Sequence, residues 1–391
     1  LLGDGWEVWA LDDLSTGYKI YALCLLVLVY ISNYTDRVLL TVLMPSIKAE
    51  FSLSDFELGL MSGTAFAIFY ASLGVPIAML ADRGSRKLVI VASVAVWSVM
   101  TAACGAAQSF AQLLLARVGV GVGEAGSNPP SHAIISDMFS LKSRATALGV
   151  YSQGVSIGLV IGIYGGAQIA EAYGWRVAFY ALGLPGVLIS LLVLLTLREP
   201  RRGASEGGIA VGEAPSLGTV LKFMLSQRAL VHTFIGSTLA TLVGYSGVLW
   251  WPTFIVRSHG LSMADMSLFL ALVFGLASGL GIFFGGFTAD RFSRRNVEWM
   301  PRVVTLAILV GLPFGVAIYL VDDSSLVFLL IAIPAFTGGF YLSPSLSIAQ
   351  SLVGVRMRVV ASGLLLFVIN IIGMGLGSAL IGALSDALEP S

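Results

Sequence analysis

The sequence predicts an all-α polytopic membrane protein. Three observations point to this fold class: an apolar composition, a series of long apolar stretches, and a repeated charged loop. Of 391 residues, 57% are hydrophobic and 11% are charged, and the mean hydropathy is +0.91. Soluble domains carry about 25% charged residues. The composition therefore excludes an ordinary soluble domain, and a net charge of zero gives no indication of a nucleic-acid partner.

Long apolar stretches recur along the whole chain, whereas a secretory signal would give one short stretch near the start. A helix needs about 20 apolar residues to cross ~30 Å of hydrocarbon. The two cysteines, Cys24 and Cys104, both lie in apolar stretches, which does not favour a disulfide framework. The predicted spans number eleven and cover residues 20–45, 57–81, 88–107, 110–136, 145–170, 177–197, 229–256, 266–289, 302–320, 326–350 and 359–385.

A polar stretch separates the sixth and seventh spans. Its Gly/Ala/Ser/Glu portion at 203–214 predicts a flexible linker, and the portion at 216–228 predicts a short surface helix. The predicted division is an N-terminal cytoplasmic segment, a six-helix bundle, a cytoplasmic linker and a C-terminal bundle with five spans. These parts cover residues 1–18, 19–197, 198–228 and 229–391.

The distribution of Lys and Arg predicts the orientation. With residue 1 in the cytoplasm, seventeen Lys and Arg residues fall on the cytoplasmic side and three, Lys48, Arg176 and Arg257, on the other. This is a strong positive-inside bias. We expect a multi-pass protein of the cell membrane with its N-terminus and linker in the cytoplasm. Two basic residues, Arg37 and Arg117, remain inside spans.

The chain contains an internal repeat. ADRGSRK (81–87) follows the second span, and ADRFSRR (289–295) follows the eighth, 208 residues later. Pro130 in the first half corresponds to Pro344 in the second, 214 residues later. Two homologous halves of six spans, joined by a cytoplasmic linker, are typical of one large class of secondary transporters. The pattern predicts a twelfth span after Asp386, so we expect a trimmed chain; the alternative is an eleven-span protein.

Four charged residues lie within predicted spans of the first half. Asp36 and Arg37 occur in ISNYTDRVLL of the first span, and Arg117 and Glu124 in the fourth. A charge at mid-bilayer costs ~3 kcal/mol on insertion scales and usually faces a cavity or a partner. Arg117 and Glu124 are two turns apart and share a face, whereas Asp36 and Arg37 are about 100° apart around their helix.

We therefore expect Asp36 to face a cavity and pair with Arg117, with Glu124 as a second proton carrier. Arg37 should find a different acceptor. The alternative is an inert ion-pair network that fixes helix packing. Packing devices tend to recur in both halves, yet the corresponding positions of the second half are uncharged: Val243, Gly244, Ile331 and Gly338. The asymmetry favours ion coupling in the first half and substrate contact in the second.

The second half is apolar and aromatic around GYSGVLWWPTFIV (244–256) and TGGFYLSPSLS (337–347). For Trp250 and Trp251 the alternative is an interfacial aromatic belt, and for His132 the alternative to a proton relay is helix packing. The predicted substrate-binding residues are Asn33, Tyr34, Arg37, Ser127, Asn128, Tyr245, Trp250 and Tyr341.

The repeated loops admit two interpretations. One is topology alone, because basic residues gather on the cytoplasmic side. The other is a conformational latch, in which each Asp binds a helix terminus and neighbouring bases in one state and releases them in another. The predicted latch residues are Asp82, Arg83, Arg86, Asp290, Arg291 and Arg294.

The loops resemble the G-x-x-x-D-R-x-G-R-K signature of the major facilitator superfamily, although Ala78, Ser85 and Ser293 replace signature glycines. LLLARVGVG resembles the fourth-helix signature of that superfamily. Within it, NYTDR, RVGVGVGEA, SDMFS, GVYSQGVSIG and LREPRRG are most similar to the spinster family. The resemblance implies two six-helix bundles, lysophospholipid or sphingoid-lipid transport, and proton sensing at Asp36 and Glu124 with Arg117 as partner.

The leading hypothesis is a proton-coupled, alternating-access transporter of an amphipathic, lipid-like substrate. NYxDR and GxGEA are also similar in organic-anion symporters, so a hexuronate-like symporter is the runner-up, and a receptor or scaffold that moves no substrate is the competitor from another class. The sequence has no metal-ligand cluster and no Ser–His or paired-Asp arrangement. We expect no enzyme activity, no cofactor and a monomer, with the proton and the lipid bilayer as partners.

Overall fold

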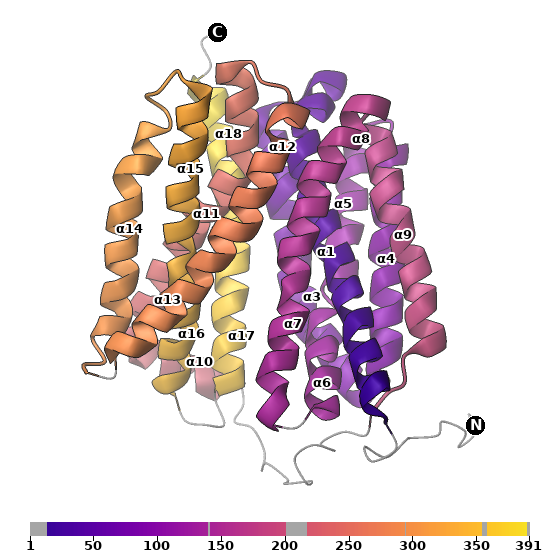
Figure 1. Ribbon diagram of the computed structural model, residues 1–391, viewed down its shortest axis with the longest axis vertical. Coiled ribbons are helices and arrows are strands. Elements are labelled where there is room, and N and C mark those ends of the chain that lie inside the picture. Colours follow the sequence, from indigo (N-terminus) through magenta and orange to yellow (C-terminus); the bar gives the residue numbers. More distant parts are fainter. Residues whose placement is uncertain (1–13, 140, 201–216, 294, 354–357, 389–391) are drawn as a thin grey trace. The chain divides into compact units, whose positions relative to one another are not determined.

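The computed structural model describes residues 14–139, 141–200, 217–293, 295–353 and 358–388, and every regular element within them is helical (Figure 1). Ten of the described helical runs are long and apolar enough to cross a membrane. The chain is therefore a multi-pass, all-α membrane protein, as the composition predicts.

The described residues of the first half of the chain contain nine α-helices. Their bounds are α1 (Thr16–Phe51), α2 (Asp55–Gly59), α3 (Ala65–Arg83), α4 (Arg86–Ala106), α5 (Phe110–Glu124), α6 (Asn128–Met138), α7 (Leu141–Val160), α8 (Gly166–Tyr173) and α9 (Trp175–Thr196). Single π-helical stretches, Leu60–Thr64 and Ile161–Gly165, join α2 to α3 and α7 to α8 into continuous spans.

The second half also contains nine described α-helices. They are α10 (Leu217–Ser226), α11 (Arg228–His259), α12 (Met263–Leu272), α13 (Ser278–Ser293), α14 (Trp299–Ala317), α15 (Ser324–Gly338), α16 (Leu342–Ser351), α17 (Arg358–Val368) and α18 (Gly377–Leu388). Two π-helical stretches, Val273–Ala277 and Ile369–Leu376, make α12–α13 and α17–α18 continuous, and the 3₁₀ turn Gly339–Tyr341 joins α15 to α16.

The fourth predicted span is interrupted. The sequence predicts one helix over 110–136, but α5 ends at Glu124 and α6 begins at Asn128 after a turn at 125–127. Pro129 and Pro130 stand in the first positions of α6, where their missing N–H groups cost nothing. Inside a continuous helix the same prolines would remove hydrogen bonds and clash with the preceding turn. Because of this break, neither α5 nor α6 is long enough to be counted as a span. Ten of the described helical runs are therefore long enough to cross a membrane, whereas the sequence predicts eleven spans.

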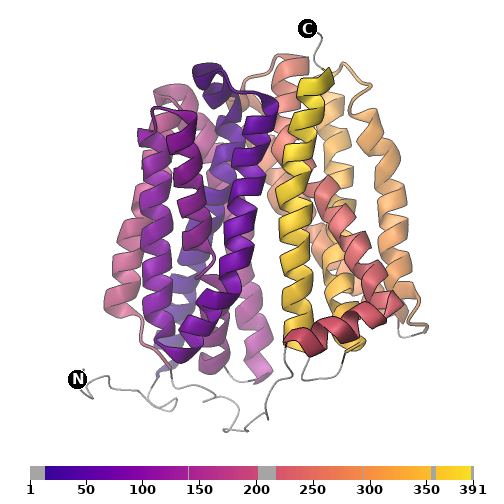
Figure 2. The ribbon, with the colours of Figure 1, turned by 180° about the vertical axis from the view of Figure 1, so that it is seen from behind.

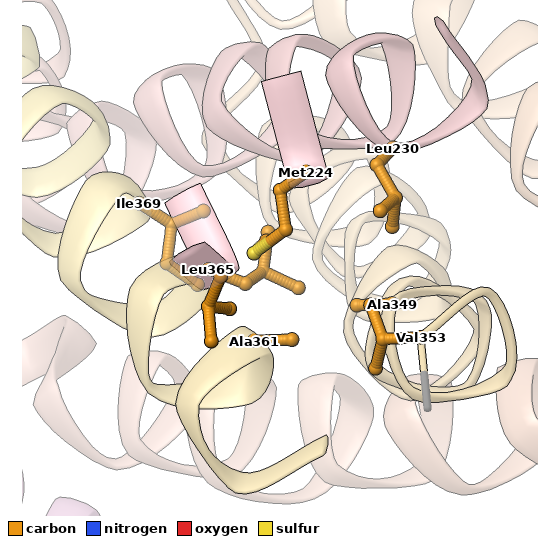
Figure 3. Packing of buried hydrophobic residues seen from close by; sticks show 8 residues of the cluster. Met224, Leu230, Ala349, Val353, Ala361, Leu365 and Ile369 are labelled. Atoms are coloured by element: carbon orange, nitrogen blue, oxygen red, sulfur yellow. The ribbon is translucent and has the colours of Figure 1, made fainter. Parts of the chain in front are cut away.

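The surface helix predicted at 216–228 is confirmed as α10. Figure 2 shows it lying crosswise at the foot of α17. Val220 and Met224 lie one turn apart and are buried, while Leu225 is exposed. Figure 3 shows Met224 directed toward Leu365 of α17, in an apolar cluster that also takes side chains from α11 and α16. The amphipathic face of α10 is thus fixed by tertiary packing.

The described residues form two compact units. The first contains the chain up to Arg37, residues Phe69–Gly158 and the residues from Arg176 to 200; the second contains Val38–Ile68, Leu159–Trp175 and the described residues from 217 onward. The α1 helix therefore passes from one unit to the other at Arg37, and α7 does so at Gly158. The predicted bundles at 19–197 and 229–391 divide the chain by sequence order, unlike these compact units, and that division stays a prediction.

A buried carboxylate organises one end of the second unit. The Asp55 side chain, at the start of α2, is fully buried. Lys48 Nζ donates to its Oδ1 at 2.5 Å, and the Arg257 guanidinium, at the end of α11, donates to both oxygens at 2.5 and 2.6 Å. The Ser385 hydroxyl donates at 2.6 Å. The carboxylate of Asp386 in α18 accepts from the backbone N–H groups at the start of α2.

In the first unit, glycines bring α4 and α5 into close contact. A Cβ atom added to Gly123 would lie 2.6 Å from the backbone nitrogen of Trp97, and one added to Gly119 would lie 2.6 Å from Met100. At Gly123 the contacted atom is backbone, so a Cβ could be accommodated only if a backbone moved, whereas at Gly119 the Met100 side chain could shift; the absence of a side chain at Gly123 therefore sets the helix spacing.

We predict that Gly123→Ala destabilises the protein by about 1–3 kcal/mol, because overpacking forces α4 and α5 apart. The measurement is the thermal unfolding midpoint in detergent. Gly74→Ala in α3 is the matched control, since nothing lies within 4 Å of its added Cβ. That control should keep or raise the midpoint, because Ala favours a helix. Equal midpoints for the two variants would contradict the close-packing account.

Candidate functional site

The first unit buries the charged residues predicted from the sequence. Asp36, in the middle of α1, has no exposed surface, and neither of its carboxylate oxygens makes a hydrogen bond of normal geometry within the described residues. The side chains that interact with it are Thr101 and Trp97 of α4 and the charged Arg117 and Glu124 of α5. The predicted neighbourhood of Asp36 and Arg117 is therefore present.

Arg37 pairs with Glu124. Its Nη2 lies 2.6 Å and its Nε 3.0 Å from Glu124 Oε2, so one oxygen accepts from two nitrogens along one edge of the guanidinium. Asn33, one turn earlier, accepts a further hydrogen bond from Nη2 at 3.4 Å. The sequence predicts that Arg37 has a separate acceptor and places Glu124 beside Arg117. The structure identifies that separate acceptor as Glu124 itself.

Two tyrosine rings flank the Arg37 guanidinium. Its central carbon lies 4.8 Å from the ring centroid of Tyr34 and 4.8 Å from that of Tyr70 in α3. Cation–π contacts of this kind stabilise an arginine by about 0.5–2 kcal/mol, more when water is excluded. Tyr34 also meets Tyr30 edge-on at 5.2 Å, and Tyr30 stacks on Tyr151 of α7 at 4.5 Å. The guanidinium is thus held in one orientation.

The break between α5 and α6 carries two predicted substrate-binding residues. Ser127 is buried, and its hydroxyl has no hydrogen-bond partner within the described residues. Asn128 begins α6 and accepts a hydrogen bond from the Tyr151 hydroxyl at 2.7 Å. His132 lies against the Tyr151 ring at 5.2 Å, as the packing interpretation predicts. The aromatic cluster and the helix break therefore belong to one site in the first unit.

The remaining predicted substrate-binding residues lie in the second unit and form a separate group. The hydroxyl oxygens of Tyr341 and Thr241 lie 2.7 Å apart, within hydrogen-bond distance, and Tyr245 is half-buried one turn further along α11. Trp250 is buried, and its indole N–H donates to the Ser378 carbonyl at 3.2 Å. The ring of Trp250 is therefore packed against neighbouring helices of the second unit.

Part of the predicted latch can be described. Arg86 forms an ion pair with Asp137 at the end of α6, and Glu199 accepts hydrogen bonds from the Ser85 hydroxyl and the Arg86 backbone N–H at the start of α4. Arg291 is exposed at the end of α13. Arg294 and the side chains of Asp82, Arg83 and Asp290 lie outside the described residues.

Several contacts in these sites were not predicted from the sequence. Tyr70 and Tyr151 carry no charge and sit in apolar stretches, so only the fold brings them to Arg37 and Asn128. Asp137 and Glu199 occur in SDMFS and LREPRRG, two segments that the sequence offers only as family likeness. The sequence shows that these two carboxylates are present, but the groups that they bind become identifiable only from the three-dimensional structure.

Comparison with known sequences and structures identifies the fold and its relatives. The sequence profile of the Major Facilitator Superfamily matches residues 26–386. An MFS-type efflux pump of Mycolicibacterium smegmatis is 33% identical over 94% of this chain and 84% of its own length. Protein spinster homolog 1 of Xenopus laevis is 27% identical over 95% of this chain and 74% of its own length. The hexuronate transporter of Bacillus subtilis is 26% identical over 94% of this chain and 88% of its own length.

Two solved structures have the same fold. The crystal structure of a bacterial homologue of the human lysosomal transporter spinster, inward-facing and unoccupied, superposes with a TM-score of 0.86 at 33% identity, covering 96% of this chain and 84% of that one. Its occupied, inward-facing form gives a TM-score of 0.83 at 34% identity, covering 96% and 83%. The predicted resemblance to the major facilitator superfamily and, within it, to the spinster family is confirmed.

We predict strong energetic coupling between Arg37 and Glu124. Arg37→Gln or Glu124→Gln alone should each cost about 3–5 kcal/mol, because each leaves a buried charge unpaired, and the double variant should cost clearly less than the sum. The measurement is a double-mutant cycle on unfolding in detergent. The exposed Arg302–Glu298 pair is the control, for which we expect coupling below about 0.5 kcal/mol. Additive effects at Arg37 and Glu124 would contradict a specific pair.

Proposed function

Because the chain belongs to the Major Facilitator Superfamily, we propose that this transporter is proton-coupled, works by alternating access and moves an amphipathic, lipid-like substrate. The family and fold are those of transporters rather than enzymes. The coupling ion, the substrate class and the cytoplasmic location of the N-terminus and linker belong to the proposal.

One observation carries the proton coupling: the burial of Asp36. A carboxylate in a membrane interior is costly when ionised unless it is paired or hydrogen-bonded. The neighbouring cation on α1, Arg37, already donates to Glu124. Arg117 is the basic residue that interacts with Asp36. In our proposal Asp36 exchanges a proton during the cycle, and its charge alternates between neutralisation by that proton and neutralisation by Arg117.

The substrate class is supported by the two groups of predicted binding residues, each taken by itself. In the first unit, the oriented guanidinium of Arg37 and the amide of Asn128 suit a polar or anionic headgroup. In the second, Tyr245 and Trp250 lie on an apolar helix and suit an alkyl chain. A ligand site needs few polar groups and a mostly apolar wall. The spinster homologues among the relatives support the same substrate class.

Alternating access also needs contacts that break. The Asp55 cluster joins α1 and α2, from the first half of the sequence, to α11 and α18, from the second. Its ion pairs depend on several side chains meeting at one carboxylate, so separation of these helices would release all of them together. We propose that opening at this end of the protein requires the cluster to dissociate.

We predict that Asp36→Asn abolishes proton-driven uptake in liposomes, because an amide cannot exchange the proton. Asp322→Asn, at an exposed residue after α14, is the matched control and should transport like the unmodified protein. Asp36→Asn protein should still bind substrate, which equilibrium binding in detergent would measure. Unchanged proton-driven uptake by Asp36→Asn would leave Asp36 with a packing role.

A second candidate is a hexuronate-like symporter, which the 26% identity to the Bacillus subtilis hexuronate transporter and the single oriented guanidinium favour. One assay distinguishes the two candidate functions. It compares proton-driven uptake of a lysophospholipid with proton-driven uptake of glucuronate. We predict uptake of the lysophospholipid alone. Uptake of glucuronate alone would establish the second candidate, and uptake of neither, with intact binding, would favour a receptor.

A further inference from the structure

We propose a second binding site in the second unit, separate from the Asp36 site, for a single-chain amphiphile with an acidic headgroup, either a carboxylate or a phosphate. The site is a cavity beside the Asp55 cluster. It lies between the last turn of α1, the start of the α2 span and the last two turns of α11. This inference goes beyond the proposed function, because it requires neither proton coupling nor a particular transported substrate.

The cavity has the size and lining of a ligand site. Its volume is about 500 Å³, within the range of ~300–1,000 Å³ that is usual for small-molecule pockets. Most of its wall is apolar, and two cations and two hydroxyls supply the polar part. The lining residues are Pro45, Lys48, Ala49, Ser52, Leu53, Leu58, Thr253, Val256 and Arg257.

Thr253 is the observation that points to a ligand. It is 3% exposed, lines the cavity, and its hydroxyl has no hydrogen-bond partner within the described residues. On the same helix, Thr233 and Thr241 donate to the carbonyl oxygens one turn earlier, at 2.8 Å each. Thr253 does not use this local partner. A buried hydroxyl left without a hydrogen bond destabilises the protein, so a ligand that supplies an acceptor would remove that cost.

The charges of the cavity wall specify an anion. Lys48 and Arg257 both contact the single carboxylate of Asp55, which leaves the three side chains with one positive charge in excess. Asp386 adds a second carboxylate behind them, where it accepts from the Asp55 and Phe56 backbone N–H groups, but neither carboxylate lines the cavity, whose wall carries the two cations. Of the three N–H donors that a lysine ammonium carries, Asp55 accepts one from Lys48. An acidic headgroup would thus meet an ammonium and a hydroxyl.

The rest of the wall specifies an alkyl chain. Pro45, Ala49, Leu53, Leu58 and Val256 line the cavity and have side chains of carbon and hydrogen alone. Each methylene buried against such a wall strengthens binding through the hydrophobic effect. A small hydrophilic anion would gain the charge contact alone, whereas an amphiphile would gain both. We therefore infer that the natural ligand combines an acidic head with a hydrocarbon chain.

The test is a protection assay at the cavity itself. Cys24 is exposed and is replaced by Ser, and Ala49, an exposed cavity residue, is replaced by Cys. The probe is dodecyl phosphate, and the readout is the concentration that halves the rate of N-ethylmaleimide modification of Cys at position 49. Dodecanoate, inorganic phosphate and dodecyltrimethylammonium are the comparison ligands. All variants are made in the full chain, and their melting temperatures are recorded.

We expect Thr253→Val to raise the half-protecting concentration of dodecyl phosphate about tenfold, because one hydrogen bond to a charged group is lost. Thr253→Ser, which keeps the hydroxyl, should stay within about twofold. Thr238→Val is the matched control: Thr238 lies on the same helix, is also buried with its hydroxyl unbonded within the described residues, and does not line the cavity. It should leave protection unchanged. Lys48→Gln should weaken protection and reduce its salt dependence.

Three results would overturn the proposal. They are equal protection by dodecyltrimethylammonium, equal protection by inorganic phosphate at the same concentration, and protection that Thr253→Val leaves unchanged. Dodecanoate protecting as well as dodecyl phosphate supports the site and assigns it to acidic amphiphiles in general; protection by dodecyl phosphate alone supports it and restricts the headgroup to phosphate. Failure here is distinguishable from failure of the proposed function, since the Asp36→Asn uptake assay does not depend on Thr253.

Discussion

The ion pair between Arg37 and Glu124 is the interaction on which the first unit depends. Inside a bilayer, a charged side chain is tolerated when a partner of opposite charge is close and well oriented. Glu124 accepts from two nitrogens of Arg37, and the ring centroids of Tyr34 and Tyr70 each lie 4.8 Å from the central carbon of its guanidinium. Because this arginine is committed to Glu124, the adjacent Asp36 has to be neutralised in another way. That constraint is the physical basis of the proposed proton coupling.

Asp36 and Arg37 lie close to the point at which α1 leaves the first compact unit. The α1 helix leaves the first compact unit at Arg37, one residue after Asp36, and α7 leaves it at Gly158. The two helices touch there: the Thr35 hydroxyl donates to the Gly158 carbonyl at 3.3 Å, and a Cβ on Gly158 would collide with the Ile31 carbonyl. In our proposal, a change of charge at Asp36 acts at the place where α1 passes between units.

Much of this arrangement could be predicted from the sequence, because the bilayer imposes strong rules. Long apolar stretches give the spans, and the cost of intramembrane charge singles out Asp36, Arg37, Arg117 and Glu124. The period of 3.6 residues correctly separates Asp36 from Arg37 and gives Arg37 an acceptor of its own. The amphipathic pattern of 217–226 gives the surface helix, which is described as α10.

The remainder depends on tertiary contacts that one sequence does not contain. Nothing in the spacing says that Glu124 faces Arg37, since that depends on how α1 and α5 are rotated against each other. The aromatic pair Tyr34 and Tyr70 meets at Arg37 only because α3 packs beside α1. The same limit applies to Asp55: in the sequence it reads as an ordinary helix-start residue, and only the fold collects Lys48 and Arg257 around it.

The central claim is that Asp36 carries the coupled proton, and the most direct test is substrate-induced proton movement in liposomes loaded with a pH-sensitive dye. With a lysophospholipid gradient and no imposed pH difference, the unmodified protein should change the internal pH. Protein carrying Asp36→Asn should exchange labelled for unlabelled substrate across the membrane without any change of internal pH. A pH change of normal size in the Asp36→Asn protein would contradict the account, because the proton would then be carried elsewhere.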